Sequence, residues 1–238
     1  MNKYITSFGG KEFGINRHLL SFGLHRNYTA EVERLFDSAK PYELLPLFYD
    51  DDWLLSKSQW ANNNNAQKVF SCPSRGWAFK SCVILDALSK MNDGDYLLWV
   101  DSNDVLIANP QPIFEFCDQH NVYFHDHWPV YYKNSDWTNR DMFVGMSCDE
   151  VKYHNAPQIQ VNIMGFKKNE FVISFVEEWA KYSTDYDVMI KNEMLNYPGY
   201  REHRHEQSIV SILREKYNMP YAQGYPYGIA REEMGIST

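Results

Sequence analysis

Two acidic residues, Asp101 and Asp104, stand directly after the apolar run YLLWV at 96–100. Such a run predicts a strand buried on both faces of a sheet, and open α/β sheets bind ligands at the carboxyl ends of their strands. On an ideal strand, side chains three residues apart would point to opposite faces. If the strand ends at Asp101, residues 101–104 can instead form a β-turn, which the intervening Ser and Asn favour, and the end Cα atoms come within about 7 Å.

Two carboxylates this close can share one hard divalent cation, Mg²⁺ or Mn²⁺. Such a cation would stabilise the negative charge that a nucleotide-diphosphate leaving group gains at the transition state of sugar transfer. An arbitrary D-x-x-D is more often an acidic turn that caps the following segment. Because this one follows a buried strand in an α/β pattern, we favour the metal site.

Charged and imidazole side chains near this strand extend the candidate site. Arg75 and Lys80 precede or open a helix predicted over 76–91, which leads to the strand. Their positive charge could meet a diphosphate or a donor sugar, or be solvated as on most surfaces. His125 and His127 would share a face of a strand, but a zinc site needs further ligands, and the chain has no C-x-x-C pair.

The elements that must position these residues alternate along the chain. Apolar runs predict strands at 3–8, 44–49, 96–100, 122–124 and 160–166, and Pro46 favours either an edge position or a strand start for the second. Apolar residues at helical spacing predict helices at 27–39, 76–91, 112–119, 169–182 and 206–217, with an exposed loop at 60–68 and scattered helical turns within 126–157. This order predicts an α/β fold class, with one domain over 1–238 and a mostly parallel central sheet flanked by helices.

The composition narrows the class of partner. The formal net charge is −8, whereas binding a nucleic-acid backbone needs basic patches, so we expect no nucleic acid. The four cysteines fit free thiols in a reducing compartment. No window reaches the ~20 apolar residues that span a bilayer, and the first residues contain no apolar run of signal length. We therefore expect a cytoplasmic protein with no membrane span.

Several stretches resemble known enzymes. The string DSNDVLI at 101–107 resembles the D-x-D or D-x-x-D metal motif of GT-A fold glycosyltransferases, and lysyl hydroxylase glycosyltransferase domains carry a similar variant. A group of bacterial and viral glycosyltransferase-like proteins is similar to RGWAFK at 75–80, NDGDYLLWVD at 92–101, RDMF at 140–143, PQIQ at 157–160, GFKKNEF at 165–171, EEW at 177–179 and HRHEQS at 203–208, in the same order and spacing. Together these stretches are distributed over residues 75–208, more than half of the chain. One departure is Glu206, where many relatives have Asp before the Gln.

This resemblance implies a single GT-A-like, Rossmann-like domain, in which residues 1–105 bind the nucleotide sugar and residues 106–238 bind the acceptor. It implies a pocket for base and ribose lined by Ser7, Phe8 and Gly9, which could equally form a plain strand-to-loop turn. The rest of the implied donor-binding set is Arg75, Lys80, Asp101, Ser102, Gln158 and Gln160. The two glutamines would share a face of their strand, although both could merely be exposed.

The resemblance also implies a third metal ligand and a sugar contact. GT-A enzymes often use a late His beside the two acids, and His203 and His205 are the late candidates here. Asp141 would face the hydroxyls of the donor sugar. The implied metal ligands are therefore Asp101, Asp104 and one of these two histidines.

Glu206 and Gln207 are the implied contacts with the acceptor or with the reacting sugar carbon. The dipole at the start of the predicted helix explains a carboxylate there as well. An inverting enzyme needs a carboxylate base, for which Asp149, Glu150 and Glu206 are candidates. In a retaining enzyme, Glu206 and Gln207 would lie beneath the sugar.

The sequence therefore predicts a metal-dependent glycosyltransferase. With Mn²⁺ or Mg²⁺, it would move a sugar from a nucleotide-diphosphate donor, a UDP- or GDP-sugar, to a glycan or other hydroxyl acceptor. Two other functions stay open. Paired carboxylates also fit a metal-dependent hydrolase of a phosphoester or glycoside, and the 16% of aromatic residues fits a non-catalytic carbohydrate-binding protein.

Overall fold

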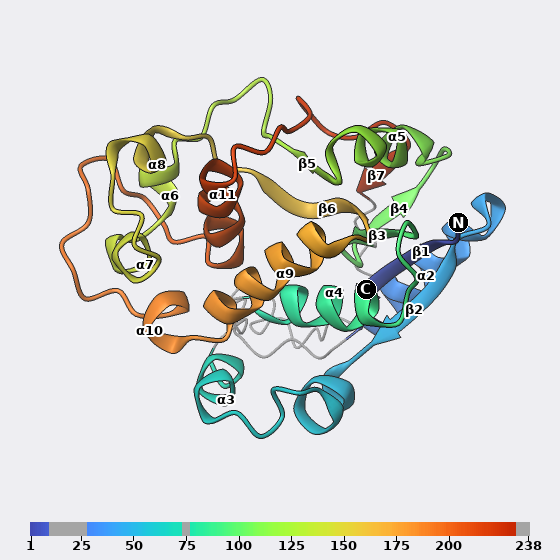
Figure 1. Ribbon diagram of the computed structural model, residues 1–238, viewed down its shortest axis with the longest axis horizontal. Helices are drawn as coiled ribbons and strands as arrows, with labels where there is room; N and C mark the ends of the chain where they lie inside the picture. The colour runs from blue at the N-terminus through green and yellow to red at the C-terminus, as the bar shows by residue number, and fades with distance from the viewer. Residues whose placement is uncertain (10–27, 73–76, 232–238) are drawn as a thin grey trace, which may run out of the picture.

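A five-stranded sheet forms the centre of the molecule (Figure 1). The structure, a computed structural model, describes residues 1–9, 28–72 and 77–231. In order across the sheet, the strands are β2 (Leu45–Tyr49), β1 (Lys3–Phe8), β3 (Tyr96–Val100), β6 (Gln160–Lys167) and β5 (Val122–His125). The edge position that Pro46 favours for β2 is confirmed.

Four of these strands run in the same direction. The strand β1 pairs in parallel with β2 and with β3, whereas β6 pairs antiparallel with both β3 and β5. The mostly parallel sheet expected from the sequence is confirmed, with β6 as the reversed strand. Because β6 runs backwards, its first residues lie at the same edge as the ends of β3 and β5.

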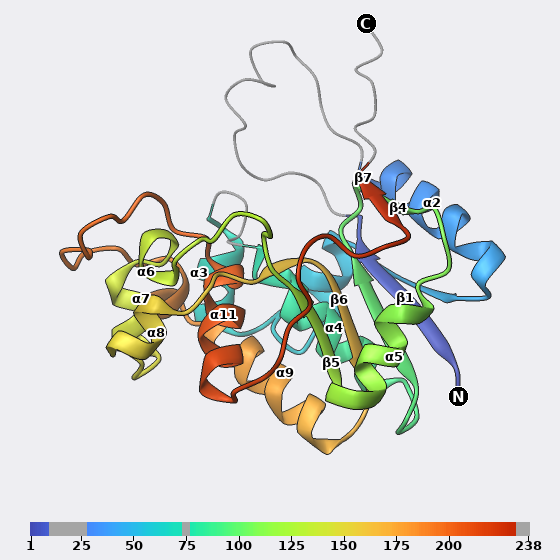
Figure 2. The same ribbon diagram turned by 90° about the horizontal axis from the view of Figure 1, so that it is seen from above.

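Helices cover both faces of the sheet. They are α2 (Tyr28–Ala39), α3 (Asn64–Phe70), α4 (Phe79–Ser89), α5 (Gln111–His120), α6 (Asn134–Trp137), α7 (Arg140–Gly145), α8 (Val151–Asn155), α9 (Glu170–Ser183), α10 (Tyr186–Met189) and α11 (Glu206–Lys216), with a 3-10 turn at Lys40–Tyr42 and a π-helical turn at Trp53–Lys57. The helices α4, α9 and α11 pack together on one face, and α2 and α5 lie on the other. In both views, α6, α7 and α8 gather at one end, beyond α11 (Figures 1 and 2).

The buried strand β3 shows why the core has two parts. Its residues Leu97 and Trp99 belong to the cluster with α4, α9 and α11, while Leu98 and Val100 belong to the cluster with α2 and α5. Alternate side chains of a strand point to opposite faces, and helices cover both, so every residue of β3 is buried. The continuous apolar run at 96–100 is thereby explained.

A second, small sheet pairs β4 (Asp104–Leu106) with β7 (Ile229–Arg231), and Figure 2 shows it beside α2. The sequence did not indicate it, because each strand is only three residues long. The predicted loop at 60–68 is wrong in its second half, where α3 begins and Asn63 caps it by accepting from the amides of Asn65 and Ala66. None of the helices in the described part of the chain is long and apolar enough to cross a membrane.

Candidate functional site

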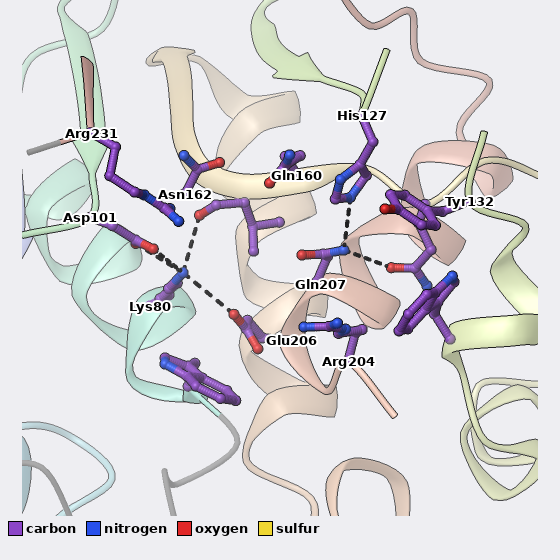
Figure 3. Close-up of a pocket in the computed structure, with 14 residues that line it drawn as sticks. Lys80, Asp101, His127, Tyr132, Gln160, Asn162, Arg204, Glu206, Gln207 and Arg231 are labelled. Atoms are coloured by element: carbon purple, nitrogen blue, oxygen red, sulfur yellow. Dashed lines mark hydrogen bonds and ion pairs between the residues drawn. The ribbon is translucent and has the colours of Figure 1, made fainter. Parts of the chain in front are cut away.

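A pocket of about 400 Å³ lies at the edge where β3 and β5 end and β6 begins (Figure 3). Its lining residues are Trp77, Lys80, Asp101, His127, Tyr132, Trp137, Gln158, Gln160, Val161, Asn162, Arg204, Glu206, Gln207 and Arg231. Six of them, Lys80, Asp101, Gln158, Gln160, Glu206 and Gln207, are predicted site residues. The carboxyl edge of the sheet thus carries the pocket, as the sequence predicts.

The turn predicted at 101–104 is present, since the amide of Asp104 donates to the carbonyl of Asp101 at 3.0 Å. The carboxylate of Asp101 faces the pocket, whereas Asp104 is fully buried beneath it. Asp104 accepts from the Tyr225 hydroxyl at 2.8 Å and the Asn162 amide at 3.2 Å, and Arg231 Nε lies 3.6 Å away. Burial raises the pKa of Asp104, the negative charge of Asp101 adds to this, and the donors oppose it.

Lys80 links the two halves of the chain within the pocket wall. Its ammonium lies 2.9 Å from Asp101 Oδ1 and 3.4 Å from Glu206 Oε1, and it donates to the Val161 carbonyl at 3.2 Å. Burial lowers the pKa of Lys80, but the two carboxylates outweigh it and leave the pKa above its usual value. Lys80 is therefore a fixed positive charge beneath the pocket.

Glu206 opens α11 and is almost fully buried. Burial raises its pKa to about 7, with Lys80 lowering it and Asp101 raising it further. Its Oε2 atom has no hydrogen-bond partner among the described residues. A buried carboxylate oxygen without a donor is costly, so a hydroxyl group of a ligand in the pocket would complete its hydrogen bonding. We call Lys80, Asp101, Glu206 and Arg231 the charged side of the pocket.

The opposite wall consists of half-buried rings, which we call the aromatic side: His127, Tyr132 and Trp137, with Arg204 stacked on them. The ring of Tyr132 meets His127 edge-on at 4.6 Å and Trp137 at 5.3 Å between centroids. The Arg204 guanidinium lies 4.7 Å from the Trp137 ring. Burial, with help from Arg204, lowers the pKa of His127 to about 4, so this ring is neutral at neutral pH.

Two glutamines join the two sides. Gln207 donates from Nε2 to Gln158 Oε1 at 3.0 Å and lies 3.4 Å from His127 Nε2. Figure 3 shows the carbonyl oxygen of Gln207 directed toward the charged side. The amide nitrogen of Gln158 is fixed by Asn134, Thr138 and Ser208. The position of Gln207 is therefore set by a buried network rather than by solvent.

The acidic turn fits a hard cation in its chemistry. Among the described residues, His, Cys, Asp and Glu form no group of three or more that could hold a metal ion. Mg²⁺, however, commonly takes one or two protein carboxylates and completes its shell with substrate phosphates and water. Asp101 faces the pocket and could supply one such carboxylate, in competition with Lys80, whereas the two oxygens of the buried Asp104 already accept from Tyr225 and Asn162.

The late histidines lie outside the pocket lining. The ring of His203 accepts from the Asn139 amide at 3.3 Å and faces the Met189 carbonyl at 3.3 Å with its other nitrogen. His205 Nδ1 lies 3.1 Å from the same carbonyl. Burial lowers the pKa of both rings. Backbone groups therefore occupy both ring nitrogens of His203 and one of His205.

The acids Asp141 and Asp149 also lie apart from the pocket lining. Asp141 accepts from the amides of Glu193 and Met194 at 3.0 and 2.8 Å, which ties α7 to the loop after α10. Asp149 belongs to a separate polar cluster, in which it accepts from Arg140, His154 and Tyr197. Burial would raise the pKa of Asp149, but these donors hold it below its usual value.

The residues at the end of β1 do not line this pocket. Ser7 is buried, and Phe8 stacks on Phe79 with centroids 4.3 Å apart. A Cβ on Gly9 would come within 2.8 Å of the end of the exposed Phe48 ring, which would have to shift to make room for it. Ser102, which follows β3, donates its hydroxyl to the Glu31 carboxylate of α2 at 3.0 Å. The predicted Arg75 lies outside the described residues.

Sequence patterns missed most of the aromatic side. Tyr132, Trp137 and Arg204 come from segments without periodicity, and nothing in their spacing separates them from other surface residues. Asn162 was recoverable, because it lies two residues after Gln160 on the same face of β6. Arg231 comes from β7, which was not foreseen.

Comparison with known proteins finds solved structures that are similar to the chain, while no protein-family model and no curated protein sequence matches the chain. The chain is similar to mouse xyloside xylosyltransferase 1 in its apo form, with 12% identity, a TM-score of 0.46, and coverage of 94% of this chain and 85% of that one. It is also similar to a glycosyltransferase involved in the glycosylation of the major capsid of PBCV-1, with 14% identity, a TM-score of 0.42, and coverage of 94% and 83%. Similarity at this level bears on the fold at most, and the function is therefore inferred from the residues of the pocket.

Proposed function

We propose that this chain is a glycosyltransferase that moves a sugar from a nucleotide-diphosphate donor, a UDP- or GDP-sugar, to a hydroxyl acceptor. The observation that carries the proposal is the network of Lys80, Asp101 and Glu206 in the wall of a polar pocket at the carboxyl edge of the sheet. A diphosphate needs fixed positive charge, and a sugar needs hydrogen-bond acceptors. The carboxylates of this network offer the acceptors, and because they already balance the charge of Lys80, Arg231 and a divalent cation would supply the positive charge that the diphosphate needs.

The order of strands along the edge supports one orientation of the donor. Ser7, Phe8 and Gly9 end β1, Asp101 ends β3, and β6 with α11 lies beyond. We place the nucleoside toward β1, the diphosphate between Lys80 and Arg231, and the sugar against α11. The buried Glu206 Oε2 atom then receives a hydroxyl group of the sugar or of the acceptor.

The metal is part of this proposal. Asp101 and Asp104 would hold Mn²⁺ or Mg²⁺, which supplies positive charge for the departing diphosphate. Lys80 gives the protein's own positive charge at the same place, and it keeps Asp101 oriented toward the pocket. The acidic turn and its hard oxygen donors support the metal site.

The reaction breaks the bond between the anomeric carbon and the diphosphate, and it forms a bond from the acceptor oxygen to that carbon. The acceptor proton passes to a base. Glu206, with a pKa of about 7, suits that role in an inverting reaction. In a retaining reaction, the carbonyl oxygen of Gln207 would support the positive charge on the sugar. The anomeric configuration of the product, read by NMR, separates the two.

Thermal unfolding with UDP and GDP, each with and without Mn²⁺, tests the proposal. We expect one nucleotide with Mn²⁺ to stabilise the protein by about 2.7 kcal/mol at a hundredfold excess over its Kd. Asp101→Asn should abolish that stabilisation. Asp118→Asn, which removes an acid of α5 that is paired with Lys167 of β6, is the matched control and should keep it. If neither nucleotide stabilises the protein under any condition, the proposed function is wrong.

A further inference from the structure

The loop that carries His127 and Tyr132 also carries an exposed tryptophan outside the pocket lining. Trp128 follows His127 directly and is 62% exposed. Tyr132, at the other end of this loop, lines the pocket. One short loop therefore presents Tyr132 inside the pocket and the exposed Trp128 outside its lining.

The backbone of this loop is fixed at both ends. Asp126 donates its amide to the Ala222 carbonyl at 3.1 Å, and Gln158 donates its amide to the Tyr132 carbonyl at 2.8 Å. The Asp126 carboxylate accepts from the amides of Trp128 at 2.9 Å and Gly224 at 2.8 Å. The exposed indole is therefore carried on a fixed backbone rather than on a free end.

The place of this loop in the sheet suggests what it binds. The loop follows β5, which lies on the far side of β6 from β3 and β1. In the proposed orientation, the nucleoside and the diphosphate lie toward β1 and β3. The β5 side is then left for the second substrate, with Gln207 between the two (Figure 3).

We propose that Tyr132 and Trp128 form an inner and an outer platform for a saccharide acceptor of at least two sugar rings. This inference rests on the proposed function and names the class of its acceptor. The apolar C–H face of a pyranose packs on an aromatic ring, while its hydroxyl groups need amide and imidazole partners. His127, which is neutral, and the amide of Gln160 lie beside the rings and supply such partners.

The mixture of groups favours a saccharide over other acceptors. A lipid tail would need a continuous apolar groove, whereas glutamine, histidine and arginine side chains interrupt the rings here. An acidic peptide would need several free cations, but Arg204 is already paired with Glu202 at 3.2 Å. A neutral oligosaccharide matches both the rings and the amides.

Saturation-transfer NMR and calorimetric titration with lactose, maltose, cellobiose and xylobiose test the inference on the whole chain. We expect at least one of these disaccharides to bind, and Trp128→Ala to weaken that binding about tenfold. Trp128→Phe keeps an aromatic face and should stay within about threefold of the unmodified protein. Because Trp128 is exposed, both variants should fold, and stabilisation by UDP or GDP should be unchanged in each.

The outcomes separate this inference from the proposed function. Nucleotide stabilisation without binding of any of the four disaccharides would overturn the saccharide platform alone. Equal disaccharide binding by Trp128→Ala and the unmodified protein would overturn it as well. A third outcome is disaccharide binding that depends on Trp128 in a protein that no nucleotide stabilises. That result would support the saccharide platform and refute the proposed transferase function.

Discussion

The charged and aromatic sides of the pocket are built in different ways. The charged side comes from the end of β3, the first turns of α4 and α11, and β7. Within it, the Lys80 ammonium contacts the carboxylates of Asp101 and Glu206. The aromatic side comes from the loop after β5 and from α6, and its rings are half-buried and meet edge-on. The charged side is thus built on the central sheet and its covering helices, whereas the aromatic side is built on a loop and a short helix at the edge of the sheet.

This difference indicates which properties of the protein a substitution on each side will change. A buried charge that loses its partner is strongly destabilising, because its desolvation is no longer compensated. A half-buried ring at a rim has fewer contacts to lose. We therefore expect changes on the charged side to alter folding, donor binding and catalysis together, and changes on the aromatic side to alter acceptor binding alone.

The largest effect is expected for Lys80→Met. It leaves the buried Glu206 and the partly exposed Asp101 without this positive partner, so the free energy of unfolding should fall by about 3 kcal/mol. Urea denaturation at neutral pH measures this change. Adding Glu206→Gln to Lys80→Met removes one uncompensated charge and should restore part of the loss. Unchanged stability in Lys80→Met would mean that the ion network does not hold the charged side together.

Glu206→Gln should lower the rate of transfer by about 100-fold, since it removes the carboxylate beside the sugar. It should also change how stability depends on pH. Because burial raises the pKa of Glu206 from 4.5 to about 7, the folded protein favours the protonated acid. Stability from this group is full below the lower value and is lost as pH rises through about 7.

Urea denaturation from about pH 5 to pH 8 checks this sign. The unmodified protein should lose more stability than Glu206→Gln over that range. If the free energy of unfolding changes with pH in the same way in both proteins, the Glu206 carboxyl has the same pKa in the folded and unfolded chains.

A smaller effect is expected for Tyr132→Leu, which removes the inner ring of the aromatic side. We expect kcat/KM for a saccharide acceptor to fall about tenfold, while stabilisation by the nucleotide stays the same. Tyr132→Phe keeps the ring and serves as the control. A loss of nucleotide binding in Tyr132→Leu would show that the two sides are not separable.

The smallest effect on activity is expected for Asp149→Asn. Its cluster with Arg140, His154 and Tyr197 lies apart from the pocket, so hydrolysis of the donor should stay within about twofold. The free energy of unfolding should fall by about 1 to 2 kcal/mol, because the amide replaces a charged acceptor. An activity loss as large as that of Glu206→Gln would place Asp149 in the catalytic machinery.

The sequence by itself determined the local elements and the acidic turn. The run at 96–100 is apolar because helices cover both faces of β3, and the turn at 101–104 forms from residues adjacent in the chain. Helical spacing likewise indicated α4, α9 and α11. Such patterns are readable because the spacing of apolar residues along one element marks the face that it buries, whichever segment covers that face.

Only the tertiary structure decided which side chains meet. Lys80 reaches Glu206 because α4 and α11 share a face of the sheet, and the pocket has an aromatic side because β6 is inserted backwards between β3 and β5. The same packing places the rings of His203 and His205 against the Met189 carbonyl. A pattern of residue types records a side chain's chemistry, but the partner it meets depends on which distant segments the sheet brings to one edge.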